Sequence, residues 1–139
     1  MSKLTPDLSS HGVIALVRNK QGKFLLLKDA RELMKGRWAP PHGRCESSDA
    51  TEKDSVIREV KEETGLAVTP VKAVLTQPAD TKVKTVSFWL VDCGSETVKL
   101  DDESSDYGWY SPLEALQLPL YPGTKLLFEK VTSGEIDLS

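Results

Sequence analysis

Three glutamates stand close together near the middle of the chain, at positions 59, 62 and 63. On a helix, the spacing i, i+3, i+4 places their carboxylates on one face, where like charges repel. Glu62 and Glu63 also fall near the carboxyl end of the expected helix, where the helix dipole disfavours negative charge. A solvated acidic face is the ordinary interpretation of such a trio. Their position favours instead a site for Mg²⁺, which prefers clustered oxygen ligands and is completed by substrate phosphates.

The helix that must position these glutamates is expected over residues 51–64. Thr51 is a plausible N-cap, and Gly65 has the character of a glycine that ends a helix. One apolar set is expected to pack on a sheet: Val56, Ile57 and Val60. Residues 38–43 (Trp-Ala-Pro-Pro-His-Gly) precede the helix, and their prolines and glycine predict no regular element. Such a rigid turn could bring backbone carbonyls beside the acidic face.

The remaining elements are a mixture of strands and helices. Strands are expected at residues 13–18, 24–28, 66–68, 71–77, 83–92 and 107–110, and further helices at 111–116 and 123–134. These elements do not alternate as repeated strand–helix–strand units, so the expected fold class is α/β, a mixed β-sheet with helices packed on both faces. Residues 1–10 are expected to be a flexible lead-in, and residues 11–139 a single domain.

Composition excludes several classes of protein. The chain has 139 residues, of which 39% are hydrophobic, and this size suits one globular domain. No apolar run approaches the roughly 20 residues of a membrane span. The net charge of −3 argues against a broad basic face for a nucleic acid polymer. Residues 1–10 lack the apolar core of a signal peptide, and Cys45 and Cys93 show no metal-ligand spacing, so a cytoplasmic protein is expected.

Residues 58–66 (Arg-Glu-Val-Lys-Glu-Glu-Thr-Gly-Leu) resemble the Nudix hydrolase signature G-x5-E-x7-R-E-U-x-E-E-x-G-U, in which U is apolar. They match its second half at every defined position, and the order of elements fits over roughly residues 11–133. The first half departs from the pattern, because one residue is inserted between Gly43 and Arg58. Asp49 then takes the place of the signature glutamate, one methylene shorter. The resemblance implies a Nudix fold, with the mixed sheet sandwiched between helices (α/β/α).

The resemblance also implies roles for individual residues. Glu62 and Glu63 would bind Mg²⁺, or alternatively Mn²⁺, together with the backbone carbonyl of His42. Glu59 would be a further metal ligand or would help to activate the attacking water. Arg58 would hold a glutamate in place through a salt bridge. The implied reaction is attack of water on a phosphorus of a nucleoside diphosphate linked to another group, which splits the pyrophosphate.

A narrower similarity concerns the substrate. Residues 38–43, 82–90 and 103–109 look like segments of asymmetrical diadenosine tetraphosphate hydrolases, although His42 replaces the lysine of that branch. By this similarity Glu103 is nominated as a further catalytic or metal-binding glutamate. A dinucleoside polyphosphate is therefore the preferred substrate, and a nucleoside triphosphate or ADP-ribose is the alternative within the family.

Five other residues are candidates for substrate binding. Lys82 and Lys84 share one face of an expected strand and could meet phosphates, or simply keep an edge strand soluble. Tyr107 could stack on a base or have a structural role. For Trp38, which leads into the turn, both alternatives are open, and Arg37 beside it is a candidate phosphate contact.

A different class of function is also carried forward. The altered loop and Asp49 are compatible with a nucleotide-binding or regulatory protein that has weakened catalysis. The intact trio Glu59, Glu62 and Glu63 argues against it, because a site that has lost catalysis has no need to keep three repelling charges together. Either way the expected partner is a small-molecule nucleotide, and the oligomeric state is not predicted.

Overall fold

The computed structural model describes residues 10–79 and 83–139. The strands are β1 (His11–Arg18), β2 (Phe24–Asp29), β3 (Trp38–Ala39), β4 (His42–Arg44), β5 (Val68–Pro78), β6 (Thr85–Cys93) and β7 (Ser104–Tyr110). The helices are α1 (Glu52–Thr64), α2 (Pro112–Ala115) and α3 (Pro122–Thr132). The expected flexible lead-in falls almost entirely on residues outside the described part, so the division into lead-in and domain stays a prediction.

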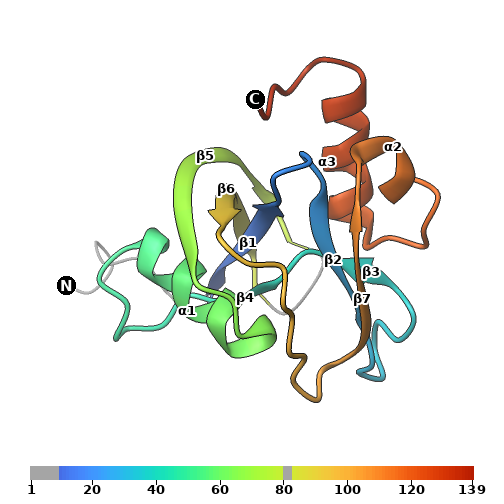
Figure 1. The fold of residues 1–139 in the computed structure, drawn as a ribbon. Helices are drawn as coiled ribbons and strands as arrows, with labels where there is room; N and C mark the ends of the chain where they lie inside the picture. Colours follow the sequence, from blue (N-terminus) through green and yellow to red (C-terminus); the bar gives the residue numbers. More distant parts are fainter. Residues whose placement is uncertain (1–9, 80–82) are drawn as a thin grey trace.

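The strands form one mixed sheet of seven strands, in the order β3-β2-β1-β6-β5, with β4 added to β1 and β7 to β2. The long central pair, β1 and β6, is parallel, and all other pairs are antiparallel. β1 and β2 pair only beside their connecting turn, at Arg18 and Phe24. Beyond that point the two strands diverge, which leaves a wedge between them (Figure 1).

Residues 38–44 cross this wedge. β3 pairs with β2 and β4 pairs with β1, so the segment passes from one diverging strand to the other. Between them, the backbone N–H of Ala15 donates to the carbonyl of Pro41 at 2.8 Å. The expectation that 38–43 would contain no regular element was wrong, because the prolines interrupt strand pairing only at their own positions. The crossing delivers His42 and Gly43 to the face of the sheet that α1 covers.

Alternate side chains of the sheet point to two separate cores, one on each face. Val13, Ala15 and Val17 of β1 pack with Val56 and Val60 of α1. The other core joins the opposite face of the sheet to α3, and its members include Leu16, Phe24, Leu26, Phe88, Leu127 and Phe128. Figure 1 shows α1 on one side of the sheet and α3 with α2 on the other. The expected α/β fold, a mixed sheet between helices, is confirmed.

Local signals set the ends of α1. The hydroxyl of Thr51 accepts from the backbone N–H of Asp54 at 3.2 Å, which caps the first turn. Gly65 follows the last turn with φ of 76°, a conformation that glycine adopts without the steric cost of a Cβ. Val56 and Val60 are fully buried as expected, but Ile57 is 38% exposed, because its side chain turns away from the sheet.

The expected pair of strands at 66–68 and 71–77 is a single strand, β5. The register of β5 against β6 shifts between Pro70 and Lys72 and again between Ala73 and Leu75. The proline is accommodated at the first of these irregularities, on an edge strand where its missing N–H breaks no further pairing. Pro70 therefore bends the strand and does not end it.

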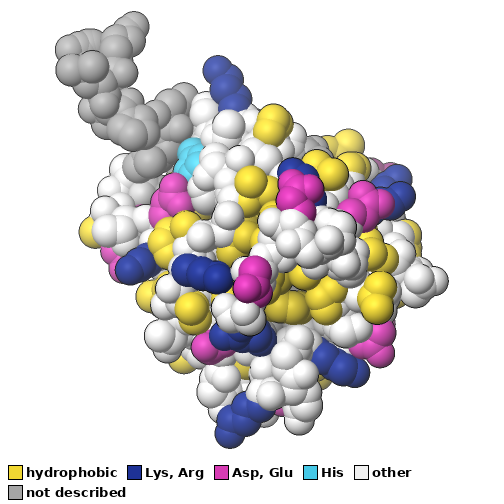
Figure 2. Space-filling view, turned by 90° about the horizontal axis from the view of Figure 1, so that it is seen from above, with side chains coloured by type: hydrophobic (Ala, Val, Ile, Leu, Met, Phe, Trp, Pro, Cys, Tyr) yellow, Lys and Arg dark blue, Asp and Glu magenta, His cyan; other side chains and the backbone are white. Residues whose placement is uncertain are grey.

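On the face drawn in Figure 2, Lys and Arg side chains are interspersed with Asp, Glu and hydrophobic side chains, and form no continuous basic band. No helix of residues 10–79 and 83–139 has the length and hydropathy that crossing a bilayer requires. Cys45 is buried and Cys93 half-buried, and both thiols are free.

Candidate active site

Arg58 organises the loop that leads into α1. Its Nε and Nη2 donate to the two carboxylate oxygens of Asp49 at 3.0 and 2.9 Å, in a bidentate pair. Nη2 also donates to the backbone carbonyl of Arg44 at 2.9 Å. The hydroxyl of Ser55 donates to the same carboxylate at 2.7 Å. Hydrogen bonds from Arg58 hold the pKa of Asp49 well below its usual range, so this buried carboxylate is ionised and fully paired.

Glu59 lies directly over the backbone of Gly43. A Cβ at position 43 would collide with the carboxyl group of Glu59, so a larger residue there would displace this carboxyl group. Nη1 of Arg58 donates to Glu59 Oε2 at 2.8 Å, which fixes the carboxylate against the turn. The expected salt bridge from Arg58 to a neighbouring glutamate is therefore present in the structure.

Glu63 is one helical turn further on and faces the same turn segment. Its side chain is 6% exposed, and Oε1 accepts a long hydrogen bond of 3.5 Å from the backbone N–H of His42. Oε2 is buried and accepts no hydrogen bond within the described residues. Burial raises the pKa of Glu63 well above its usual value, and the nearby carboxyl of Glu59 raises it further. Burial also raises the pKa of Glu59, despite the opposing effect of Arg58.

These observations test whether the residues suit a divalent cation. A buried oxygen without a donor and two adjacent carboxyls with raised pKa values are arrangements that an added positive charge would stabilise. Glu62 is 57% exposed and is held by Nη1 of Arg58 at 3.3 Å. Among residues 10–79 and 83–139, no cluster of three or more Asp, Glu, His or Cys side chains is arranged closely enough to hold a metal ion. The carboxylate oxygens of Glu59, Glu62 and Glu63 are of the kind that Mg²⁺ prefers, and Glu62 would have to leave Arg58 and turn toward the other two to share one ion.

The carboxylates open into a cleft of about 540 Å³. Its acidic lining residues are Asp29, Glu46, Glu59, Glu62, Glu63, Asp101 and Glu103. Its basic lining residues are Arg31 and Arg44, and its apolar lining includes Leu33, Met34, Val83 and Val86. A cleft of this size accommodates a nucleotide.

Sequence reasoning missed one wall of this cleft, which consists of Asp29, Arg31 and Tyr121. The Tyr121 hydroxyl donates to Asp29 across 92 positions of sequence. No local motif joins these residues, and the only signal was an Asp and an Arg at the end of an apolar strand. Asp101 was also missed, because it lies among exposed polar residues.

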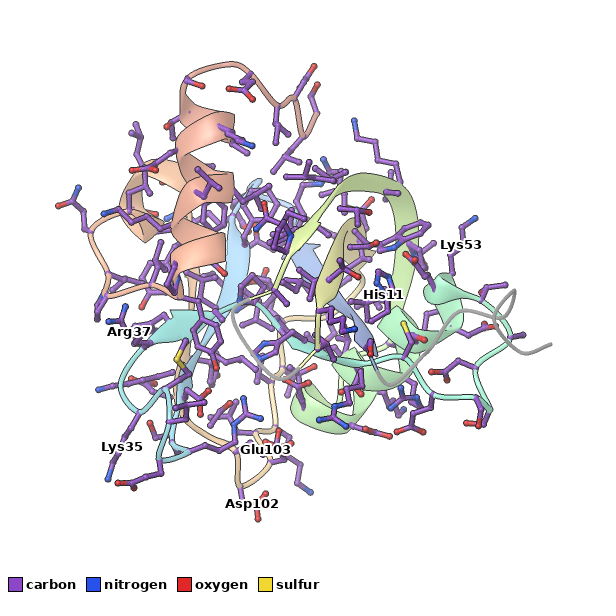
Figure 3. The ribbon with its side chains drawn as sticks, turned by 180° about the vertical axis from the view of Figure 1, so that it is seen from behind. His11, Lys35, Arg37, Lys53, Asp102 and Glu103 are labelled. Carbon is purple, nitrogen blue, oxygen red and sulfur yellow. The ribbon has the colours of Figure 1, made fainter. Side chains whose placement is uncertain are left out.

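Glu103, nominated by the narrower resemblance, does line the cleft. It lies in the loop before β7, and Figure 3 shows it beside Asp102 at the edge of the molecule. Its side chain is 48% exposed and forms an ion pair of 3.5 Å with Nη1 of Arg31. It therefore stands on the wall of the cleft opposite to α1.

The described residues expected to bind substrate lie outside the lining of the cleft: Arg37, Trp38, Lys84 and Tyr107. Trp38 is buried in the core, with its ring edge-on to Tyr110 at 5.8 Å. Arg37 donates to the carbonyl of Leu120 at 3.0 Å and holds the chain before α3. Tyr107 is 39% exposed on β7, and Lys84 is exposed beside β6. Lys82 lies outside the described residues. The geometry gives Trp38 and Arg37 structural contacts.

The comparisons with known proteins agree with this geometry. The NUDIX domain family matches residues 9–131. The chain is 30% identical to nucleoside triphosphatase NudI of Escherichia coli over 81% of this chain and 89% of that protein. It is 33% identical to the mouse 8-oxo-dGDP phosphatase NUDT18 over 78% of this chain. The chain spans about a third of the length of NUDT18 and of the other first curated relatives that it matches.

Solved structures show the same fold. The MutT protein of Methanosarcina mazei superposes with a TM-score of 0.73 and 31% identity, over 90% of this chain and 94% of that one. An Ap4A hydrolase of Caenorhabditis elegans gives a TM-score of 0.73 at 23% identity, over 89% and 97% of the two chains. The shared fold, the acidic helix over a glycine turn and the matched domain lead to one conclusion. This chain belongs to the NUDIX domain family.

Proposed function

We propose that the chain hydrolyses a pyrophosphate linkage in a nucleoside diphosphate joined to another group, with Mg²⁺ or alternatively Mn²⁺ held by the acidic side of α1. The single observation that carries this proposal is the buried, unpaired Oε2 of Glu63 beside the carboxyl of Glu59. Carboxyls with pKa values raised by burial gather at functional sites, where a bound cation can stabilise their charged form.

Glu59, Glu62, Glu63 and the backbone of His42 are the residues that would hold the cation. When bound, a divalent cation neutralises charge on the phosphate oxygens and makes a coordinated water more acidic. Arg58 keeps the Glu59 carboxylate over Gly43 and, through Asp49, fixes the loop that contains this turn. Glu59 or Glu103 is then the group that accepts a proton from the attacking water, and both line the cleft.

Two substrate classes are supported by different observations. A nucleoside triphosphate is favoured by the similarity to NudI, which extends over most of both chains. A dinucleoside polyphosphate is favoured by the segments at 38–43, 82–90 and 103–109. Among the described residues nominated in these segments, His42 and Glu103 line the cleft. The core position of Trp38 weakens the second case. The expected cytoplasmic location and the presence of a single small-molecule partner also stay predictions.

The test is product analysis with Mg²⁺ against diadenosine tetraphosphate, ADP-ribose, several nucleoside triphosphates and 8-oxo-dGDP. Release of a mononucleotide from any of these is expected, and its identity assigns the substrate class. The Glu63→Gln variant, purified in the same way, excludes a contaminating enzyme. Retention of a ligand without turnover by the wild type would replace the proposal with a nucleotide-binding role.

A further inference from the structure

The wall of the cleft opposite to α1 is built around one arginine. Nε and Nη2 of Arg31 donate to the two carboxylate oxygens of Asp29 at 3.1 and 3.0 Å. Nη2 also lies 3.4 Å from the hydroxyl of Tyr121, which itself donates to Asp29. Asp29 and Tyr121 are 5% and 4% exposed, whereas the Arg31 side chain is 47% exposed. Asp29 and Tyr121 thus hold the Nε–Nη2 edge of the Arg31 guanidinium, and the rest of this group reaches the cleft.

The remaining donor group of Arg31 is Nη1, and its contact is the longest in this cluster. Nη1 lies 3.5 Å from Glu103, a carboxylate that is 48% exposed and therefore screened by water. An incoming anion can replace this contact at small cost, because the bidentate pair with Asp29 is left intact. Arg31 is thus a fixed cation with donors available toward the cleft.

The position of Arg31 relates it to the proposed metal ligands. Arg31, Glu63, Glu103 and Tyr121 together line one small recess of the cleft wall. Arg44, the other basic residue in the lining, is exposed, and among the described residues no buried side chain is found to hold its guanidinium. This recess holds only about 10 Å³, so an anion bound to Arg31 would lie in the adjoining cleft, between Arg31 and the acidic face of α1.

We propose that Arg31 binds a phosphate group of the substrate in the cleft, on the opposite side from the carboxylates of α1. Asp29 and Tyr121 are positioning residues, since they orient the guanidinium and do not face the phosphate themselves. This inference rests on the proposed function, because it assigns a phosphate chain to the cleft. It adds that the substrate is held at both ends of that chain, by a cation on α1 and by a fork of N–H donors on the loop after β2.

The two walls of the cleft therefore have different functions: the Arg31 wall binds phosphate, and the α1 wall binds the metal ion. Loss of Arg31 removes binding of the phosphate chain and leaves the metal ligands in place. Loss of Glu63 removes metal binding and leaves the arginine in place. The two effects separate when nucleotide binding and metal binding are measured independently.

The experiment is calorimetric titration with α,β-methylene-ADP, a nucleotide whose bridging carbon resists hydrolysis, in Mg²⁺ and again in EDTA. Arg31→Gln is compared with Lys35→Gln, a matched removal of one positive charge from the same loop, outside the cleft lining (Figure 3). Arg31→Gln is expected to weaken binding about tenfold or more in both buffers, as one charge-assisted contact would. Lys35→Gln is expected to change it less than twofold, and Mn²⁺ binding should stay within twofold of wild type in both variants.

Arg31→Lys is the control for the possibility that Arg31→Gln weakens binding by destabilising the fold. A lysine still neutralises the buried Asp29, so the melting temperature should stay near that of wild type, yet a single ammonium cannot bridge Asp29 and a phosphate as the planar fork does. It should weaken nucleotide binding several-fold. Equal weakening by Lys35→Gln, wild-type affinity in Arg31→Gln, or no binding of the analogue to the wild type each overturns the proposal.

The failure of this inference is distinguishable from failure of the proposed function. Turnover by the wild type with unchanged binding in Arg31→Gln would remove the arginine subsite and keep the hydrolase. Weakened binding in Arg31→Gln without turnover of any substrate by the wild type would keep the subsite and remove the hydrolase.

Discussion

Asp49 and Glu63 are both buried carboxylates within reach of helix α1, and the protein treats them in opposite ways. Asp49 receives two donors from Arg58 and one from Ser55, and its pKa is lowered. Glu63 has one long hydrogen bond and an oxygen with no donor, and its pKa is raised. The charge of Asp49 is therefore stabilised by donors within the chain, whereas the charge of Glu63 would be stabilised by a bound cation. The first arrangement is structural, and the second identifies the site of chemistry.

The largest effect expected is on turnover in Glu63→Gln. The amide keeps the shape of the side chain and removes the charge that a cation requires, so kcat/KM should fall at least about a hundredfold, which corresponds to about 2.7 kcal/mol. The metal-free melting temperature should stay equal or rise, because an unfavourable buried charge is lost. A clear fall in metal-free stability would show that Glu63 is structural like Asp49.

The converse change is Asp49→Asn, which leaves Arg58 without its carboxylate partner. Breaking a largely buried pair in this way is expected to lower the free energy of unfolding by about 3 kcal/mol, measured by urea denaturation without metal. Asp49→Glu restores the charge and should recover most of that loss while changing activity only modestly. Wild-type stability in Asp49→Asn would contradict the structural role of the Asp49–Arg58 pair.

Glu62 sharpens the comparison, because it is exposed and already neutralised by Arg58. Glu62→Gln should reduce turnover by about tenfold or more and shift the melting temperature by less than about 2 °C. Steady-state kinetics and thermal melts on the same preparation check both parts. Full activity in this variant would exclude Glu62 from the metal ligands.

The smallest effect concerns pH. Because the pKa values of Glu59 and Glu63 are raised in the folded protein, their contribution to stability is present below the ordinary glutamate value and is lost as pH rises through the raised values. The metal-free wild type should therefore lose about 1 kcal/mol or more of stability between about pH 5 and pH 8. Asp49 acts in the opposite direction, and only as pH falls below about 3.8. The loss above pH 5 should be much smaller in Glu63→Gln, and an identical slope in both proteins would contradict this account.

The parts of the fold that sequence reasoning predicted are those with local causes. Helix α1 was expected because Thr51 and Gly65 mark its ends, and the spacing of its glutamates placed them on one face. The strands from Val13 and Phe24 were expected because their apolar runs flank a turn. In each case neighbours in sequence are also neighbours in space.

What was missed depends on contacts between distant residues. Arg31 acquires its orientation from Tyr121, which no local pattern connects to it. Trp38 precedes the turn that forms the site, but its neighbours across the sheet bury it in the core. Pairing with β6 carries β5 past Pro70 as one strand. Proximity in sequence to a functional turn is thus a weak guide to which side chains line the cleft.

The central claim is that the buried, unpaired carboxylate of Glu63 exists for a divalent cation. Titration of Mn²⁺ at pH 7.5, followed by electron paramagnetic resonance, tests it without any substrate, in wild type, Glu63→Gln and the control Glu129→Gln from the exposed face of α3. We predict binding to the wild type and the control, and at least about tenfold weaker binding to Glu63→Gln, whose metal-free fold is at least as stable. Equal Mn²⁺ affinity in Glu63→Gln and wild type would contradict the claim.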